Sequence, residues 1–367
     1  MKFDRRLFFH FDWILLILAL FISFVGLLNI YSTGYSIADQ SPLYLKQAGW
    51  IFIGLVFMGI VLCIDYRLIS SHAYIIYVFS LLLLVGVFLY GDVTHGSQRW
   101  IVIGGFSFQP SELVKLTMIL ALAKYFADHR TNRGYRLTEI LVPFLIVLIP
   151  FLFIIKQPDL GTALILLILF LSIILFVGLD WKSLVFAAMG CVVLIPVGWY
   201  FLKDYQKERI ITFFSPERDP LGSGYHIIQS IIAVGSGGIL GKGFLKGTQT
   251  QLKFLPVQQT DFVFSVFAEE WGFLGGLILM VTFLTLILWC LKIAFRSRDL
   301  VGTIISMGIT MLIFWEVLVN IGMVLGILPV VGIPLPFLSY GGSSMVVLLT
   351  GIGLLMNVSM RRFILRP

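Results

Sequence analysis

The sequence contains few charged residues and few cysteines. Asp, Glu, Lys and Arg make up 12% of the 367 residues, whereas 59% of them are hydrophobic. Soluble domains carry about a quarter of their residues as charged side chains, so this composition excludes a water-facing globule. The three cysteines, Cys63, Cys191 and Cys290, all lie inside apolar runs. Their spacing fits neither a disulfide framework nor a metal site, and we interpret them as small apolar side chains.

The sequence also lacks a nucleotide-binding loop, and we expect no cleavable leader. The Gly-Ser-Gly-Gly run at 235–238 has no P-loop lysine or hydroxyl residue after it, which argues against ATP use. The first apolar stretch is too long for a signal-peptide core, so we expect an uncleaved first span. The net charge is +7, but the basic residues lie between apolar runs. We therefore expect them to face anionic lipid and to orient the chain, with no nucleic-acid partner.

Ten apolar runs are long enough to cross a membrane as helices. They lie near 13–31, 49–64, 73–90, 110–127, 140–155, 160–179, 181–201, 262–292, 301–326 and 338–360. We expect an all-α polytopic membrane protein with ten transmembrane helices, forming a single integral membrane domain over residues 1–367. The run at 262–292 is long enough to tilt or to extend beyond the bilayer.

Lys and Arg are distributed unequally between the two sets of short loops. One side carries Lys2, Arg5, Arg6, Arg67, Arg130, Arg133, Arg136, Lys182, Lys292, Arg296, Arg298, Arg361, Arg362 and Arg366. The other side carries Lys46, Arg99 and Lys156. The positive-inside rule then predicts that both termini are cytoplasmic and that the long segment 202–261 is extracytoplasmic.

The segment 202–261 is far longer than any other loop. Loops of this length are usually functional or disordered. Phe213, Phe214 and Tyr225 make this one too apolar for disorder. Its glycines between Gly235 and Gly243 predict tight turns or close backbone approach. We expect a folded loop that lies on the membrane and contains short interfacial helices.

Ionisable residues at membrane depth are costly and are candidates for function. Glu112 and Lys115 are three residues apart near the start of the fourth predicted span, so they share a helix face. They form either an ion pair that holds helices together or a charged site that positions substrate. Asp159 follows Pro158 at the start of the sixth predicted span. It is either a helix cap or an acidic group at the outer mouth of a polar cavity.

A third group of polar residues begins the eighth predicted span. Asp261, Ser265 and Glu269 are spaced four residues apart, so they lie along one face of a helix. A cap formed by Asp261 with Thr260 explains only the first of them. The full stripe predicts a polar cleft that descends from the outer edge of the membrane into the bundle.

A fourth group surrounds Ser339, where two prolines and two glycines flank the polar run from Ser339 to Ser344. Irregular backbone is not tolerated against lipid, so we expect a broken helix that lines a cavity. Glu316 and Asn320, one turn apart, form a further polar patch that we interpret as helix–helix hydrogen bonding.

Three arginines on the predicted outer side, Arg99, Arg209 and Arg218, could contact phosphate or could snorkel at the interface.

These motifs together resemble the family of shape, elongation, division and sporulation proteins, and within it the RodA type more than the FtsW type. The similarity runs nearly from end to end, and the motifs follow the family order. The matching stretches are Gly96–Trp100, Phe108–Lys115, Gln157–Ala163, Asp219–Gly243, Phe254–Gly272 and Pro334–Ser344.

The resemblance implies a peptidoglycan glycosyltransferase of the bacterial cytoplasmic membrane that polymerises lipid II at the outer face into β-1,4 glycan strands. It implies a class B penicillin-binding protein as partner, together with other proteins of the elongation complex. It also implies that Asp261 is essential and that Glu112 and Lys115 are a sensitive pair.

For the chemistry we expect Asp261 to act as general base. We expect Arg99, Glu112, Lys115, Asp159, Arg209, Arg218, Ser265, Glu269 and Ser339 to bind substrate. A divalent cation such as Mg²⁺ or Mn²⁺ could assist at Asp261 or Asp159, although the sequence shows no dedicated ligand cluster. Two alternatives stay open: a lipid II flippase, for which a polar path through the bundle would be equally suitable, and a non-catalytic scaffold for the partner enzyme.

Overall fold

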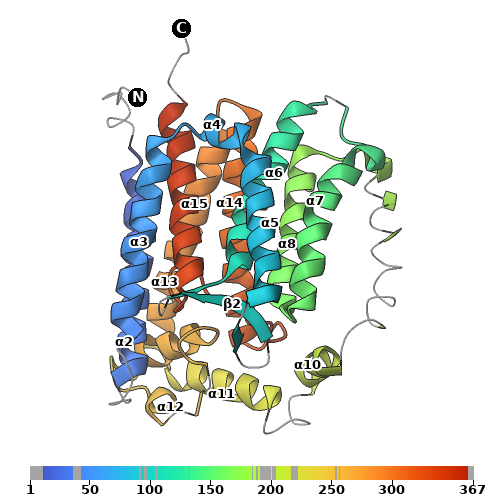
Figure 1. Cartoon of the computed structure of the whole chain (residues 1–367). Helices are drawn as coiled ribbons and strands as arrows, with labels where there is room; N and C mark the ends of the chain where they lie inside the picture. The colour runs from blue at the N-terminus through green and yellow to red at the C-terminus, as the bar shows by residue number, and fades with distance from the viewer. Residues whose placement is uncertain are drawn as a thin grey trace.

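Long apolar helices dominate the structure (Figure 1). The computed structural model describes residues 11–35, 43–90, 92–94, 97–103, 106–131, 133–183, 185–186, 189–190, 200, 204–215, 222–252, 254–255 and 257–362. Seven helices within these ranges are long and apolar enough to cross a membrane. They are α2 (Trp13–Tyr35), α3 (Leu43–Cys63), α7 (Leu137–Lys156), α8 (Leu160–Val177), α13 (Val263–Phe295), α14 (Leu300–Val324) and α15 (Gly342–Arg361). The chain is therefore a multi-pass, mainly helical membrane protein.

Two further helices coincide with predicted spans. The helix α5 (Ala73–Tyr90) has 18 residues, as many as α8, the shortest of the seven, and α6 (Pro110–Asp128) carries charged side chains that reduce its hydropathy. Most of the seventh predicted span, 181–201, lies outside the described residues. Nine of the ten predicted spans thus coincide with helices.

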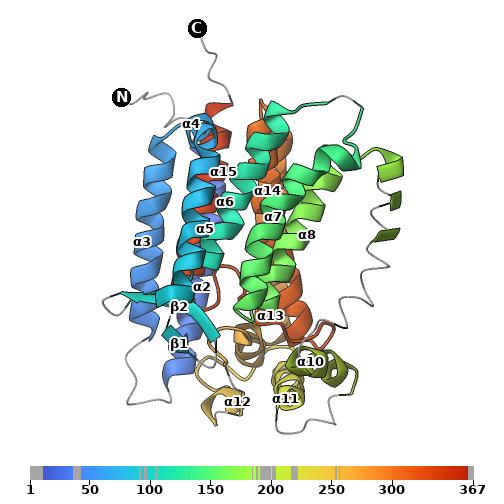
Figure 2. The same cartoon turned by 45° about the vertical axis from the view of Figure 1, so that its right-hand side comes forward.

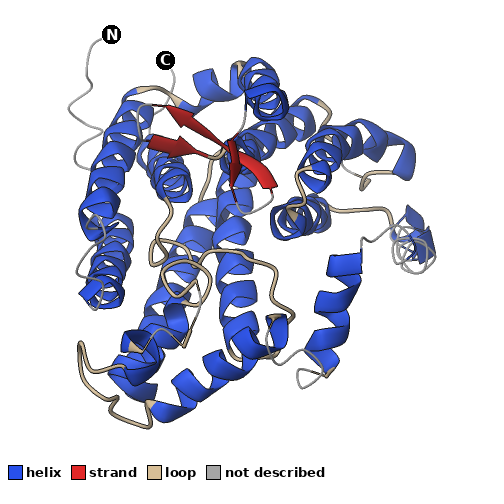
Figure 3. Ribbon diagram, turned by 60° about the horizontal axis from the view of Figure 1, so that its bottom comes forward, coloured by secondary structure: helices blue, strands red, loops and turns tan. Residues whose placement is uncertain are grey.

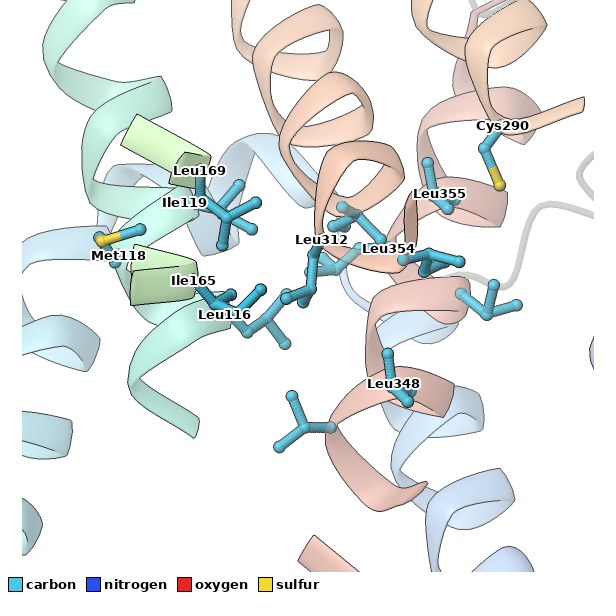
Figure 4. Close-up of a cluster of buried hydrophobic side chains, with 14 of the residues drawn as sticks. Leu116, Met118, Ile119, Ile165, Leu169, Cys290, Leu312, Leu348, Leu354 and Leu355 are labelled. Atoms are coloured by element: carbon cyan, nitrogen blue, oxygen red, sulfur yellow. The ribbon is translucent and has the colours of Figure 1, made fainter. Parts of the chain in front are cut away.

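The core of the bundle surrounds α15, which is buried along almost its whole length and packs against α2, α3, α6, α13 and α14. Figure 4 shows apolar side chains of several helices meeting in this core: Leu116 and Ile119 of α6, Ile165 and Leu169 of α8, Leu312 of α14, and Leu348, Leu354 and Leu355 of α15. By contrast, apolar side chains such as Phe52 of α3 and Ile278 of α13 point outwards. Exposed apolar surface of this kind is expected where lipid replaces water as the solvent.

One end of the bundle gathers the start of α2, the end of α15 and the short helix α4 (Tyr66–Ser71). Asp12 accepts a hydrogen bond from Trp289, and Ser359 near the end of α15 donates to the same carboxylate at 3.3 Å. Asn357 accepts from the backbone N–H of Tyr66 at 3.1 Å. Arg67 and Tyr66 both bond Asp299, the residue that caps α14. These polar contacts fix the start of α2 and the end of α15 at the same end of the molecule.

The opposite end carries a small sheet and the helices of the long loop (Figures 1 and 2). Antiparallel strands β1 (Asp92–Thr94), β2 (Ser97–Ile103) and β3 (Phe106–Phe108) form the sheet in the order β1-β2-β3. The prediction of an all-α fold missed it, because its strands are short and occupy a connection between spans. The loop contains α10 (Asp204–Phe214), α11 (Ser223–Ser236) and α12 (Thr248–Gln251). Figure 3 brings this end of the bundle forward and shows that the strands and these helices cover different parts of the end.

The helix α13 is broken at Gly272, where φ is +66°. A short outer part, 263–271, is followed by a long part, 273–295. The groups freed by the break bond the chain at 238–243. Lys242 and Gly243 donate to the carbonyls of Glu269 and Glu270 at 3.0 Å each, and Phe273 donates to Gly238 at 2.9 Å. We call residues 237–243 the glycine turn.

Glycines are required where the glycine turn meets α13. A Cβ at Gly237 would lie 2.1 Å from the carbonyl oxygen of Ala268, and one at Gly241 would lie 2.1 Å from that of Glu270. The predicted close backbone approach is therefore confirmed. It explains why this loop is ordered against the bundle: backbone groups satisfy one another without intervening side chains.

Replacing Gly237 with alanine is expected to destabilise the protein by about 1–3 kcal/mol, because the added methyl group must displace backbone of α13. Gly235 supplies a matched control, since nothing lies within 4 Å of its Cβ position. Gly235→Ala should leave stability unchanged or slightly increased. Thermal unfolding of both variants in one detergent measures the difference; equal midpoints would contradict the packing described here.

Candidate functional site

Asp261 lies at the loop-bearing end of the bundle, just before α13. The helix begins at Val263, and its N-cap residue is Phe262, with no side-chain cap. Asp261 therefore does not cap the helix. The residue is partly exposed, and its carboxylate faces Gly332: a Cβ at that glycine would lie 3.4 Å from Asp261 Oδ2. The absence of a side chain at 332 thus leaves space beside the carboxylate.

Asn320 of α14 fixes the backbone on both sides of this space. Its side-chain amide donates to the carbonyl of Asp261 at 3.0 Å and to that of Ile333 at 2.7 Å. Asn320 is fully buried, so both bonds form in a protein interior. The sequence had suggested helix–helix bonding for Asn320. The structure shows that it joins the start of α13 to the segment after α14.

Ser339 makes a second connection between the same two segments. Its hydroxyl donates to the carbonyl of Thr260 at 2.6 Å and accepts from the backbone N–H of Leu335 at 2.8 Å. The backbone N–H of Tyr340 donates to Gln259 at 2.8 Å. The chain from 325 to 341 has no regular helix, and its part from 335 to 339 is buried, as expected for irregular backbone at membrane depth. Ser339 therefore supports the backbone that carries Asp261.

Asp159 and Arg99 lie close together at this end of the bundle. Asp159 caps α8, accepting from the backbone N–H of Thr162 at 3.2 Å, which confirms the cap interpretation. Its carboxylate also accepts from Gln109 at 3.3 Å and lies 3.9 Å from the Arg99 guanidinium. Arg99, on β2, donates to the carbonyls of Gln157 and Pro158. The sheet thus fixes an arginine against the corner between α7 and α8.

These charges act together on Asp261. Burial raises the pKa of Asp261 to about 6, and the charge of Asp159 adds to this effect. A hydrogen bond from Thr260 and the positive charges of Arg209 and Arg99 oppose it. Arg209 lies on α10 and is exposed. A carboxyl group with a pKa near 6 is ionised at neutral pH and is a stronger base than an ordinary aspartate.

Glu112 and Lys115 form a buried cluster with Glu316. The ammonium group of Lys115 lies 2.9 Å from Glu112 and 2.5 Å from Glu316, and all three side chains are excluded from solvent. Two carboxylates share one cation, and Oε2 of Glu316 has no hydrogen-bond partner. Glu316 and Asn320 are one turn apart on α14. The cluster therefore joins α6 to the helix whose next turn fixes Asp261.

Ser265 and Glu269 face the long loop, on the outer part of α13. The Ser265 hydroxyl lies 2.8 Å from that of Ser230 on α11. Glu269 accepts from Lys242 at 2.7 Å and from the backbone N–H of Gln249 at 3.1 Å. Both side chains are fully buried. Ser265 and Glu269 therefore share a helix face, as predicted, but both attach the loop to α13, and Asp261 lies before the helix and is partly exposed.

Of the remaining candidate residues, Arg218 lies outside the described residues. Two residues that hold the outer part of α13 in place were not identified from the sequence. Asn29 of α2 donates to the carbonyl of Val263 at 2.8 Å, and Ser32 donates to Glu270. The signal for both was present, because polar side chains inside the first apolar run are costly and need partners.

The donor set at Asp261 and Asp159 does not fit a dedicated metal site. In the described ranges no group of three or more His, Cys, Asp or Glu residues gathers as metal ligands do. Both oxygens of Asp159 already accept hydrogen bonds, from Thr162 and Gln109. We therefore derive no step through a metal ion.

Solved structures share this overall fold. A chain of a peptidoglycan synthase complex, studied for how it coordinates polymerisation and crosslinking, superposes with a TM-score of 0.82 at 36% identity, covering 96% of this chain and 98% of that one. The rod shape determining protein RodA of Thermus thermophilus superposes with a TM-score of 0.72 at 30% identity and the same coverage.

Sequence comparison gives the same result. The peptidoglycan glycosyltransferase MrdB of Escherichia coli K12 is 40% identical over 360 residues, which is 96% of this chain and 94% of the relative. The sequence model of the FtsW/RodA/SpoVE family, described as cell cycle proteins, matches residues 10–363 of this chain. The end-to-end match and the shared fold together show that this chain belongs to the FtsW/RodA/SpoVE family and is of the RodA type.

Proposed function

We propose that this chain is a peptidoglycan glycosyltransferase that polymerises lipid II into β-1,4 glycan strands for cell-wall elongation, with Asp261 as general base. The relatives of similar length are named for this activity, and the flippase alternative is not favoured by them. The observation that carries the assignment of the base is the position of the Asp261 carboxylate. It lies beside the space left by Gly332, on backbone fixed by Asn320.

The reaction needs one displacement. Lipid II carries its disaccharide in α-linkage to an undecaprenyl diphosphate, and the product link is β-1,4. The 4-hydroxyl of an acceptor sugar attacks the anomeric carbon as the bond to the diphosphate breaks, with inversion. Asp261 accepts the hydroxyl proton as the new bond forms. Asn320 and Ser339 keep the base at a fixed position, since they bond the backbone of Asp261 and Thr260 rather than the reacting carboxylate.

The leaving diphosphate requires positive charge on its oxygens. Among the candidate cations, Arg209 is exposed and close enough to act on Asp261 electrostatically. Arg99 is partly exposed and is oriented by the backbone of Gln157 and Pro158. Lys115 is buried between two carboxylates, so we assign it a structural role. We propose Arg209 and Arg99 as the diphosphate contacts, with Arg218 as a further candidate.

The proposed topology places the reaction at the outer membrane face. The loop charges predict cytoplasmic termini, and the start of α2 and end of α15 lie at the end of the bundle opposite the long loop. The whole chain then forms one integral membrane domain in the bacterial cytoplasmic membrane, with the 202–261 loop outside. There it can meet a class B penicillin-binding protein, which would crosslink the new strands.

A polymerisation assay on purified chain in proteoliposomes containing lipid II tests the proposal, with and without a cognate class B penicillin-binding protein whose transpeptidase serine is replaced. Glycan strands that muramidase digests to disaccharide units are expected in the presence of the partner. If neither sample forms glycan while lipid II still crosses the bilayer, the flippase alternative would be correct. If neither polymer nor lipid movement occurs, the scaffold alternative would be correct.

A further inference from the structure

The glycine turn exposes two consecutive large apolar side chains. Ile239 is 69% exposed and Leu240 is 78% exposed. Large apolar side chains at the tip of a tight, ordered turn forgo the favourable free energy of burial if they face water. In this protein the solvent at a given surface is either water or lipid, so the depth of the turn decides which solvent meets the tip.

Backbone bonds fix the depth of the tip. Phe273 and Leu274 donate to the carbonyls of Gly238 and Ile239 at 2.9 and 3.1 Å, so the tip lies at the first residues after the break in α13. The long part of α13, from 273 to 295, rises about 34 Å at 1.5 Å per residue. The hydrocarbon core is about 30 Å thick. The long part therefore spans it with little to spare, and the residues around Phe273 lie at its outer boundary.

Aromatic side chains mark the same level independently. Trp271 lies 6.4 Å from Phe244, and Phe244 lies 6.5 Å from Tyr31, which in turn is 5.2 Å from Tyr44 (ring centroids). These rings come from α2, α3, the residue after the glycine turn, and the break in α13. Tyr and Trp gather at the membrane–water interface, where an apolar ring and a polar group are both accommodated.

The surface around the tip is continuous with the lipid-facing surface of α13. Phe273, Leu277 and Ile278 are all exposed and apolar on a helix that crosses the membrane. The one charged residue of the turn, Lys242, is drawn inwards to the buried carboxylate of Glu269 at 2.7 Å. No unpaired charge of the turn therefore has to enter the bilayer with the tip.

We propose that the glycine turn is a re-entrant element whose tip, Ile239 and Leu240, is inserted into the outer leaflet of the bilayer beside the break in α13. Lipid is the occupant of this surface. Because the turn also bonds the outer part of α13, insertion sets the height of that part above the hydrocarbon. If Asp261 is the base, the same contact sets the depth at which it meets a lipid-borne substrate; this consequence rests on the proposed function, whereas insertion does not.

Spin labels in proteoliposomes test the insertion. The parent is full-length protein with Cys63, Cys191 and Cys290 replaced by alanine, and single cysteines are introduced as Leu240→Cys, Leu277→Cys and Lys246→Cys. Collision of each label with oxygen, which partitions into lipid, is compared with collision with a water-soluble nickel chelate. The label at 277 gives the lipid reference. The label at 246, an exposed residue three positions beyond the turn, gives the aqueous reference.

The label at 240 is expected to favour oxygen over the chelate, as the label at 277 does, and the label at 246 is expected to show the opposite preference. An aqueous ratio at 240 would overturn the proposal. Low collision with both reagents would also overturn it, because it would show that protein covers the tip. Insertion with an inactive enzyme would leave the proposal intact and would count against the proposed function alone.

Discussion

Replacing Asp261 with asparagine is expected to lower the rate of glycan formation from lipid II by about 10²–10⁴-fold, the range for loss of a positioned general base. Asparagine keeps the size and the backbone contacts of Asp261, including the bond from Asn320. It cannot accept the proton of the attacking hydroxyl. Single-turnover kinetics with labelled lipid II in proteoliposomes measures the chemical step.

The same variant is expected to be more stable than the wild type at neutral pH. Because burial raises the pKa of Asp261 from near 4 to about 6, its ionised form is less favourable in the folded protein than in the unfolded chain. Removing that charge should stabilise the fold by up to about 3 kcal/mol at pH 7, and the gain should vanish below about pH 4, where both states are protonated. Thermal midpoints in detergent measure it.

Asp128→Asn is the matched control. Asp128 lies at the end of α6, far from the site, and forms an exposed ion pair with Lys124 at 3.1 Å. Its substitution should leave both rate and stability nearly unchanged. Wild-type turnover in a folded Asp261→Asn variant would remove Asp261 as the base.

Replacing Lys115 with methionine is expected to destabilise the protein by about 3–5 kcal/mol. The change removes the only cation within hydrogen-bond distance of two buried carboxylates in the described cluster, and uncompensated buried charge is the costly outcome. Methionine has a similar length of apolar side chain, so the loss of stability results from removal of the charge more than from a change in side-chain volume. Thermal unfolding in detergent gives the midpoint, and lipid II turnover shows whether the displaced α14 disturbs Asn320 and Asp261.

Lys124→Met tests the same chemistry farther along α6, at an exposed pair, and should cost less than about 1 kcal/mol. Adding Glu112→Gln and Glu316→Gln to Lys115→Met should recover much of the lost stability, since neutral groups replace the unpaired charges. If Lys115→Met unfolds at the same temperature as Lys124→Met, the buried cluster does not stabilise the bundle. If the triple variant regains stability but stays inactive, the cluster has a role in catalysis as well.

The sequence was most informative where the physics is local. Runs of about twenty apolar residues must be helical in lipid, so the spans and the irregular stretch before α15 could be predicted without contacts. The helix cap at Asp159 and the close approach of the Gly235–Gly243 chain were also predictable, because each depends on neighbouring residues or on the absence of a side chain.

Contacts between distant segments could not be predicted in this way. Spacing placed Asp261, Ser265 and Glu269 on one face but did not tell which partner each would meet. The outer part of α13, before the break at Gly272, packs against the loop. Ser265 therefore contacts Ser230, and Glu269 pairs with Lys242. Similarly, Glu112 and Lys115 were predicted to be a pair. Glu316 lies some 200 positions later in the sequence, and its carboxylate adds a second negative charge beside Lys115.

The pH dependence of the chemical step tests the assignment of Asp261 most directly. Single-turnover glycan formation by the wild type is measured in proteoliposomes equilibrated on both sides at each pH from 4.5 to 8. The rate should be constant above about pH 7 and should fall about tenfold per unit below about pH 6, as Asp261 is protonated. The residual rate of Asp261→Asn should lack this fall. A wild-type rate that stays constant from pH 7 to pH 5, in folded protein, would contradict the assignment.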